Sequence, residues 1–119
     1  MKDTLEDIER LEAEFQSCQK VLTAFGDEMR QHILCMMLKS ECSGSRVIEI
    51  AQKTNLSRPA VSHHMQILKN SGIVKSRKEG TCIYYYLDPD DNTLGSLITL
   101  FSDVKKIMED VPDRSGELI

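Results

Sequence analysis

The segment from residue 46 to residue 71 constrains the fold most strongly, because small, turn-forming and apolar residues follow one another there at fixed spacings. Ala51 is small enough for two helices to cross closely. Asn55 follows four residues later, and after glycine it is asparagine that best tolerates the left-handed backbone of a tight turn. Val61 comes six residues after that, on the inward face of a second helix. This spacing predicts a helix-turn-helix, although a plain helical hairpin would share part of the pattern.

Capping residues set the expected limits of these two helices. The first should cover 46–53, with Ser45 as its cap. Ser57 can cap the second, and Pro59 suits its first turn because a missing N–H costs little there. Gly72 should end it. The inward face of the second helix should carry the apolar residues at helical steps, which are Val61, Met65 and Leu68.

The chain beyond this helix predicts a β-hairpin over 74–87. Two strand-like runs flank the Glu-Gly pair at 79–80, and the glycine can supply the positive φ of a tight turn. Side chains alternate between the two faces of a strand. The core-facing side should carry Ile83, Tyr85 and Leu87, and the wetter side Cys82, Tyr84 and Tyr86.

Two amphipathic helices should flank this central part. Apolar residues recur at steps of three or four from Leu5 to Phe25, with Asp3 and Glu6 spaced as a capping pair, and recur again from Leu94 onward. The pattern predicts helices over 4–25 and 92–111 within a single domain of residues 1–111, followed by a disordered tail, 112–119.

One more helix should lie between the first amphipathic helix and the helix-turn-helix. Gly26 breaks the preceding stripe, and Asp27 can cap a helix over 27–39. The residues that this helix should turn toward a core are Ile33, Leu34, Met37 and Leu38. The following segment, 40–45, is predicted to be a loop.

Charge is unevenly distributed along the 119 residues, whose net charge is -4. Residues 46–86 hold seven basic and two acidic side chains, a net +5. Residues 1–45 hold five basic and nine acidic side chains, a net -4, and residues 87–119 hold three and eight, a net -5. A basic centre between acidic ends favours a surface for a polyanion, with chance clustering as the alternative.

Several classes of protein find no support in the sequence. No apolar run approaches the roughly 20 residues of a membrane-spanning helix, and the N-terminus has no apolar core of a secretory signal. A cytoplasmic location without membrane contact is therefore expected, in which the four cysteines stay reduced. Neither a C-x-x-C pair nor a phosphate loop nor a nucleophile–base pair is present, so neither an enzyme nor a bound cofactor is predicted.

Taken together, these elements make a winged helix, mainly α with a small β-hairpin and flanked by two further helices. The motifs within it resemble the ArsR/SmtB family of bacterial repressors. The similar segments are DEMRQHIL at 27–34, LSRPAVSHHMQILKNSGIV at 56–74 and RKEGTCIYYYL at 77–87. The resemblance implies a homodimer that pairs through its first and last helices, binds double-stranded operator DNA and releases it when a small inducer binds. A winged-helix module that binds protein is the rival interpretation, but it would not need the basic centre.

The recognition helix of such a protein presents donors to the major groove and cations to phosphates. The predicted DNA contacts are Ser57, Arg58, Ala60, Ser62, His63, His64, Gln66, Lys69, Arg77 and Lys78. Arginine and glutamine suit base edges, and the residues of the hairpin suit phosphates. So small a core cannot cover both apolar stripes, and the predicted dimer contacts are Leu11, Phe15, Leu22, Leu97, Phe101 and Val104.

The family's metal sites are not matched in this sequence. The resemblance places a thiolate pair on Arg46 and Ile48, and the histidines of a last-helix site on Thr93 and Val104. None of these is the required soft or imidazole ligand. The adjacent residues His63 and His64 point about 100° apart on a helix and do not readily share one ion. No metal site is therefore predicted.

A thiol sensor is half matched. Cys35, within HILCMML, resembles the first cysteine of family members that sense persulfides or oxidants, but the position of the second falls on Lys106. Cys42 would be about 10 Å away along a continuous helix, which is too far for a disulfide, and it could approach Cys35 only if the helix ended early. Cys35 is thus a candidate sensor, with a small buried apolar residue as the plainer interpretation.

Overall fold

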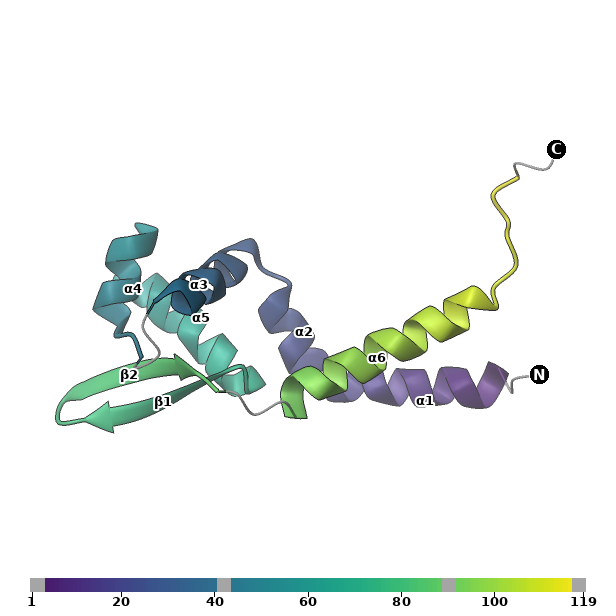
Figure 1. Cartoon of the computed structure of the whole chain (residues 1–119), viewed down its shortest axis with the longest axis horizontal. Helices are drawn as coiled ribbons and strands as arrows, with labels where there is room; N and C mark the ends of the chain where they lie inside the picture. The colour runs from purple at the N-terminus through teal and green to yellow at the C-terminus, as the bar shows by residue number, and fades with distance from the viewer. Residues whose placement is uncertain (1–3, 41–43, 89–91, 117–119) are drawn as a thin grey trace.

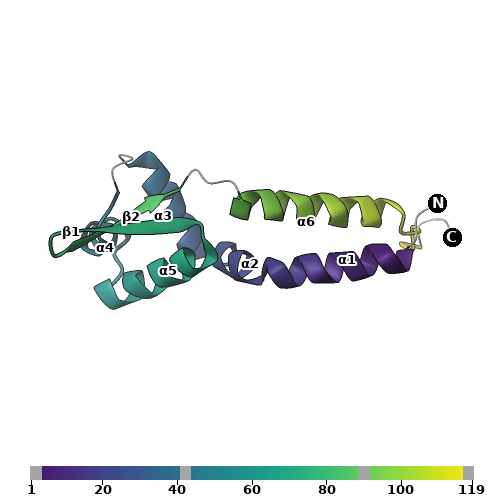
Figure 2. The same cartoon turned by 90° about the horizontal axis from the view of Figure 1, so that it is seen from below.

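The protein consists of a head and an arm, as seen in the computed structural model, which describes residues 4–40, 44–88 and 92–116 (Figure 1). The arm contains α1 (Thr4–Ser17) and α6 (Asn92–Glu109), which lie side by side and run in opposite directions (Figure 2). The head contains α3 (Glu28–Lys39), α4 (Val47–Thr54), α5 (Arg58–Ser71) and the antiparallel strands β1 (Val74–Glu79) and β2 (Cys82–Leu87). A short helix, α2 (Gln19–Phe25), joins the two parts. The mainly helical winged-helix fold is thereby confirmed.

The core of the head forms where α5 packs against its neighbours. The side chains with no exposed surface in this core are Ala24, Ile33, Ile50, Val61, Met65, Leu68 and Val74. Ala51 is also buried, and α4 packs directly on α5 as its small side chain predicts. The inward face of α5 therefore follows the helical steps seen in the sequence.

Local chemistry determines the turn and the ends of α5 as predicted. Asn55 has φ 60° and adopts the left-handed conformation. The Ser57 hydroxyl accepts a hydrogen bond from the Ala60 N–H at 3.2 Å. Gly72 ends the helix with φ 89°, and a Cβ atom at this position would lie 2.7 Å from Oγ1 of Thr93. Glycine is therefore required twice, by its backbone conformation and by the approach of α6.

The start of α4 differs from the prediction. Ser45 does not cap this helix; its N–H and C=O both pair with the backbone of Tyr85, each at 2.8 Å. Arg46 precedes the helix instead, and its N–H donates to the Glu49 carboxylate at 2.8 Å. That hydrogen bond holds the pKa of Glu49 below its usual value. The chain before α4 is consequently attached to the hairpin.

The first predicted helix, 4–25, is interrupted at Cys18. α1 ends at Ser17 and α2 begins at Gln19, although hydrogen bonds continue on both sides of the break. The Ser17 hydroxyl donates to the backbone carbonyls of Ala13 and Glu14, a type of contact that bends helices. Asp3, the expected cap, lies outside the described residues.

A few predicted details of the head are wrong. Leu38 is 72% exposed because it lies on the outer side of α3, whereas Met37 points inward. Ile83 is 49% exposed because it pairs with Lys78 in the part of the hairpin beyond the core. The turn consists of Gly80, with φ 63°, and Thr81 rather than the Glu-Gly pair.

For the hairpin and the loops, some further predictions are confirmed, and others concern residues outside the described ranges. Tyr85 and Leu87 pack against the core as predicted. Within the predicted loop, 41–43 lie outside the described residues. The last three residues of the predicted tail, 117–119, do so as well, and its disorder stays a prediction.

The arm has a small core of its own, and this changes the expected dimer contacts. The buried residues there are Cys18, Val21, Leu97 and Leu100. Of the six predicted dimer residues, Leu97 belongs to this core, and Leu11, Leu22 and Val104 pack against it. They face the chain's own arm because α1 and α6 lie against each other. Phe15 and Phe101 remain exposed. In the described ranges, no helix is both long and apolar enough to cross a membrane.

Candidate nucleic-acid interface

Helix α5 lies next to the hairpin (Figure 1). Its outer face carries a row of polar and basic side chains. The predicted contact residues exposed here are Ser57, Arg58, Ser62, His63, Gln66 and Lys69, and Ala60 is half-buried among them. Every third or fourth residue is turned inward to the core, so the exposed positions occupy one side of the helix. Hydroxyl, imidazole, amide and cationic groups are thereby gathered on one surface.

Two of these residues already have partners within the helix. The Ser57 hydroxyl accepts from the Ala60 N–H, which leaves its own O–H free to donate outward. The Gln66 amide donates to Oδ1 of Asn70 at 3.0 Å. Contact of Gln66 with a base edge would have to replace that hydrogen bond or share its amide group.

His64 does not belong to this outer row. Its imidazole is half-buried, and Nδ1 lies 3.3 Å from Nη1 of Arg30 on α3. His63 is exposed, with the two ring centroids 6.0 Å apart, as expected for consecutive helical residues that point in different directions. His64 is thus partly turned toward α3, and its contact with DNA stays a prediction.

The hairpin holds its arginine between aromatic rings and a carboxylate. The guanidinium of Arg77 lies 5.0 Å from the ring centroid of Tyr84 and 5.8 Å from that of Tyr86. Its Nε also donates to Oε2 of Glu79 at 2.6 Å. Cation–π contacts of this kind fix the direction of a long side chain. Lys78 is exposed beside them, and Lys75 pairs with Asp88 at 3.2 Å.

The sequence contained a signal for this arrangement that residue-by-residue inspection did not use. Arg77 stands directly opposite Tyr84 in the hairpin register, and Tyr86 lies on the same face of β2. Alternation along β2 predicts the wetter face of these tyrosines, and the register across the hairpin adds the arginine to that face. The competing carboxylate of Glu79, two residues along, was also missed.

Removing the carboxylate of Glu79 should strengthen DNA binding. We expect Glu79→Gln to tighten binding by about 0.2–1 kcal/mol, which is what an exposed ion pair contributes. In the variant, Arg77 can bind a phosphate without first losing its ion pair with Glu79. Titration of a labelled duplex at constant salt measures this. Glu12→Gln removes the same charge from α1 in the arm and should leave the affinity unchanged. Equal effects of the two substitutions would show that only net charge matters.

The cysteines are distributed over separate environments. Cys35 is exposed, so the interpretation as a small buried residue is wrong for this position. Cys18 is buried and Cys82 is half-buried. Cys42 lies outside the described residues, and the distance from Cys35 to Cys42 is untested. Among the described residues, no three His, Cys, Asp or Glu side chains are grouped closely enough to hold a metal ion.

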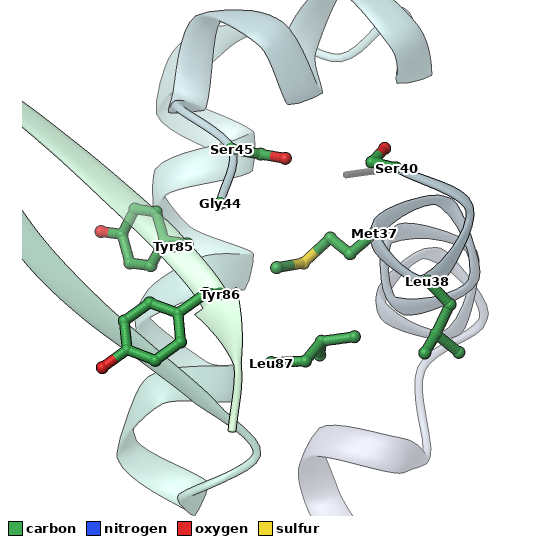
Figure 3. A pocket seen from close by; sticks show the side chains of 8 residues that line it. All are labelled: Met37, Leu38, Ser40, Gly44, Ser45, Tyr85, Tyr86 and Leu87. Atoms are coloured by element: carbon green, nitrogen blue, oxygen red, sulfur yellow. The ribbon is translucent and has the colours of Figure 1, made fainter. Parts of the chain in front are cut away.

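A small cavity lies at the base of the hairpin, between the end of α3 and β2 (Figure 3). Its volume is about 170 Å³, and its walls include Met37, Leu38, Tyr86 and Leu87 together with Ser40 and the Gly44–Ser45 backbone. Ligand pockets usually enclose about 300–1,000 Å³. We therefore assign no ligand to this cavity.

The fold and the exposed face of α5 define a winged helix-turn-helix protein, and comparison with known proteins identifies its family. A model of the bacterial regulatory proteins of the arsR family matches residues 27–76. An uncharacterized HTH-type transcriptional regulator of Methanocaldococcus jannaschii is 37% identical over 76 residues, which cover 64% of this chain and 83% of that protein. The transcriptional activator HlyU of Vibrio cholerae is 33% identical over 81 residues, or 68% of this chain and 72% of that protein.

Solved structures agree on the fold. The winged helix-turn-helix domain of a possible ArsR-family regulator from Mycobacterium bovis superposes with a TM-score of 0.56 at 21% identity, over 96% of this chain and 97% of that domain. The chain belongs to the ArsR family. It is a DNA-binding transcriptional regulator.

Proposed function

We propose that this regulator is a homodimeric repressor that places α5 in the major groove, contacts flanking phosphates through the hairpin and leaves its operator when a small inducer binds. The observation that carries the proposal is the outer row on α5, which includes the exposed Arg58 and Lys69, together with the exposed Lys78 of the hairpin that packs against this helix. Repression follows from occupancy, because a protein bound across a promoter excludes polymerase. The inducer is expected to be small, and Cys35 stays a candidate sensor.

Pairing of two chains is supported by the apolar surface of the arm. The large apolar side chains of α1 and α6 that stay exposed are Leu5, Ile8, Phe15, Leu94, Ile98, Phe101 and Met108. So much apolar surface is typical of an interface rather than of a monomer. A two-fold interface would bring each arm against its copy and set two recognition helices about one turn of DNA apart. The Mycobacterium bovis domain of the same fold is homodimeric.

Substitution at Phe101 tests this pairing. Its side chain is 54% exposed, so an interface would bury roughly half of its surface, worth about 1 kcal/mol per copy and about 2 kcal/mol per dimer. We expect Phe101→Ser to weaken the dimer by that amount in sedimentation equilibrium. Ser102→Ala, at an exposed neighbouring position, is the control. A wild type that sediments as a monomer at micromolar concentration would refute the homodimer.

Salt dependence and Arg58 test the DNA-contacting surface. Several phosphate contacts release several counterions, so wild-type affinity should fall steeply as salt rises. Arg58→Ala should weaken binding by about 1–3 kcal/mol and relax the preference at one base pair, if the guanidinium contacts a base edge. Arg10→Ala, on α1, removes the same charge away from α5 and should have little effect. The duplex would be one enriched by the wild type from a random library.

Transcription in vitro separates repression from activation. The enriched duplex is placed across a constitutive promoter, and transcript is measured as the protein is added. The proposal requires a decrease that follows the binding curve and is absent with Arg58→Ala. An increase would show an activator, which is what the Vibrio cholerae relative is named to be.

A further inference from the structure

A single buried guanidinium connects the recognition helix to the helix that leads into the arm. Arg30 is 7% exposed. Its Nε donates to the Ala24 carbonyl at 3.0 Å and its Nη2 to the Thr23 carbonyl at 2.8 Å, both near the end of α2. Its Nη1 lies 3.3 Å from Oδ2 of Asp27 at the start of α3 and 3.3 Å from Nδ1 of His64 on α5. We call these five residues the Arg30 cluster.

The cluster requires one protonation state of His64. A guanidinium carries only donors, so Nδ1 of His64 has to be the acceptor. The imidazole must then be neutral, with its proton on Nε2. A proton added at Nδ1 would remove the acceptor and place a second cation 3.3 Å from Arg30. The contact between α3 and α5 through His64 therefore exists only without that proton.

The surroundings of His64 disfavour its charged form. Burial is the main cause that lowers its pKa, and the positive charge of Arg30 and the neighbouring His63 act in the same direction. Asp27 opposes them without reversing the direction. On α2, the Arg30 cluster contains only backbone carbonyls, and Lys20 lies further along that helix near Ile67 and Asn70.

The charges that shift the pKa of His64 come from Asp27, Arg30 and His63, not from the other described neighbours of α5. α4 and β1 also pack against α5, and the charged side chains on them are Glu49, Lys53, Lys75, Arg77, Lys78 and Glu79. Within the described part of the chain, the groups that shift the pKa of His64 are on α3 and α5. The local balance is thus set by the cluster and His63.

We propose that His64 is a proton-sensitive positioning residue, which holds α5 at its DNA-binding angle to α2 when neutral and releases it when protonated. Arg30 is the residue through which it acts. Neither group needs to touch DNA, and no part of this inference depends on the chain being a repressor or on the identity of an inducer. The expected consequence is weaker DNA binding in mildly acidic solution.

The direction of the effect follows from linkage. In the DNA-binding conformation the pKa of His64 is lowered, whereas in a released conformation it would return toward 6.5. The released form then binds more protons at low pH. Above pH 6.5 the released form therefore has no protonation advantage over the DNA-binding form. The advantage appears as the pH falls below 6.5, and it is complete once the pH is below the lowered pKa of His64. Protonation of the exposed His63 has the opposite effect, because a cation there attracts phosphate.

The first experiment measures DNA affinity from pH 5.5 to pH 7.5 at constant salt, with the duplex enriched from a random library. Wild-type protein should lose affinity several-fold at the acidic end. His64→Asn keeps an acceptor near the position of Nδ1 that does not titrate, so this loss should disappear. His63→Asn, the adjacent control, should retain the loss and enlarge it, because the favourable charge at residue 63 is gone. An equal acidic loss in His64→Asn and wild type would overturn the proposal.

The second experiment uses the wild-type protein alone, so it requires neither DNA nor a correctly folded variant. Nitrogen-detected NMR of the wild-type protein across the same pH range should show neutral His64 protonated on Nε2, with a pKa below the ordinary imidazole value of 6.5. A proton on Nδ1 in the neutral form, or a pKa of His64 at or above 6.5, would overturn the proposal. Failure of DNA binding at every pH, with this NMR result intact, would instead count against the proposed operator function alone.

Discussion

Leu68→Ala is expected to lower the free energy of unfolding by about 2–5 kcal/mol, the range found when a large aliphatic side chain is truncated in a packed core. Leu68 has no exposed surface and lies on the inward face of α5, in the cluster shared with Ile33, Ile50 and Val74. The loss includes both the transfer of its methyl groups and the cavity left behind. Because α5, the helix proposed to contact DNA, is packed through this residue, operator binding should fall together with stability.

Urea denaturation at a fixed protein concentration gives this free energy, since pairing would otherwise make the midpoint depend on concentration. Leu38→Ala is the matched control. Leu38 is 72% exposed on α3, so the same truncation there should change stability by less than about 0.5 kcal/mol. Similar losses for the two leucines would mean that Leu68 is not in the core.

Arg30→Met should lower the free energy of unfolding by about 2–4 kcal/mol, although methionine is apolar and long enough to fill much of the space. The substitution leaves the carbonyl of the buried Ala24 without its donor, and a buried acceptor left unpaired costs about 1–3 kcal/mol. The Thr23 carbonyl keeps the Gly26 N–H at 3.2 Å but loses the hydrogen bond from the charged guanidinium, and such a bond contributes about 1.5–3 kcal/mol. Arg30→Lys retains the charge, but a single ammonium group cannot reach the partners on α2, α3 and α5 together. It should recover only part of the loss.

Calorimetry or urea denaturation at neutral pH measures these variants, with Arg10→Met as the control for an exposed arginine on α1. Arg10 pairs with Asp7 at 3.1 Å and is itself largely exposed, and an ion pair of this kind contributes little. If Arg30→Met were as stable as Arg10→Met, water would have to satisfy the carbonyls at the end of α2. The positioning role of Arg30 would then be lost as well.

Features decided by neighbouring residues could be predicted from the sequence. Asn55, Ser57 and Gly72 each act on the backbone within a few residues of themselves, and all three adopt the predicted role. The inward positions of Val61, Met65 and Leu68 follow from helical geometry alone. These residues define the helix-turn-helix, so the fold and the outer face of α5 were accessible before any coordinates.

Features decided by distant residues could not be predicted. Ser45 resembled a helix cap, but Tyr85, which is 40 positions away, takes both of its backbone groups. His64 resembled a DNA contact, but Arg30 is available to it from 34 positions away. In both cases a local pattern competes with a partner that only the folded chain brings close, and the partner prevails because a buried polar group must be satisfied.

The same limit applies to the arm. The sequence shows two apolar stripes, one on each helix of the arm. Their periodicity does not distinguish the residues that pack between α1 and α6 of one chain from those that stay exposed. The approach of α1 to α6 assigns Leu97 to the first group and Phe101 to the second. Because that assignment depends on the relative rotation of two helices, residue spacing along either helix alone does not contain it.

The contact between Gly72 and Thr93 has a consequence for how such a protein can change. Gly72 lies at the start of the segment that contains the hairpin, and Thr93 lies at its end. The two residues are so close that a methyl group on Gly72 would clash with the Thr93 hydroxyl. The hairpin is therefore a loop whose two ends meet, so residues can be gained or lost within it without changing where α6 begins. The length and composition of the hairpin can thus vary while the arm keeps its place on the head.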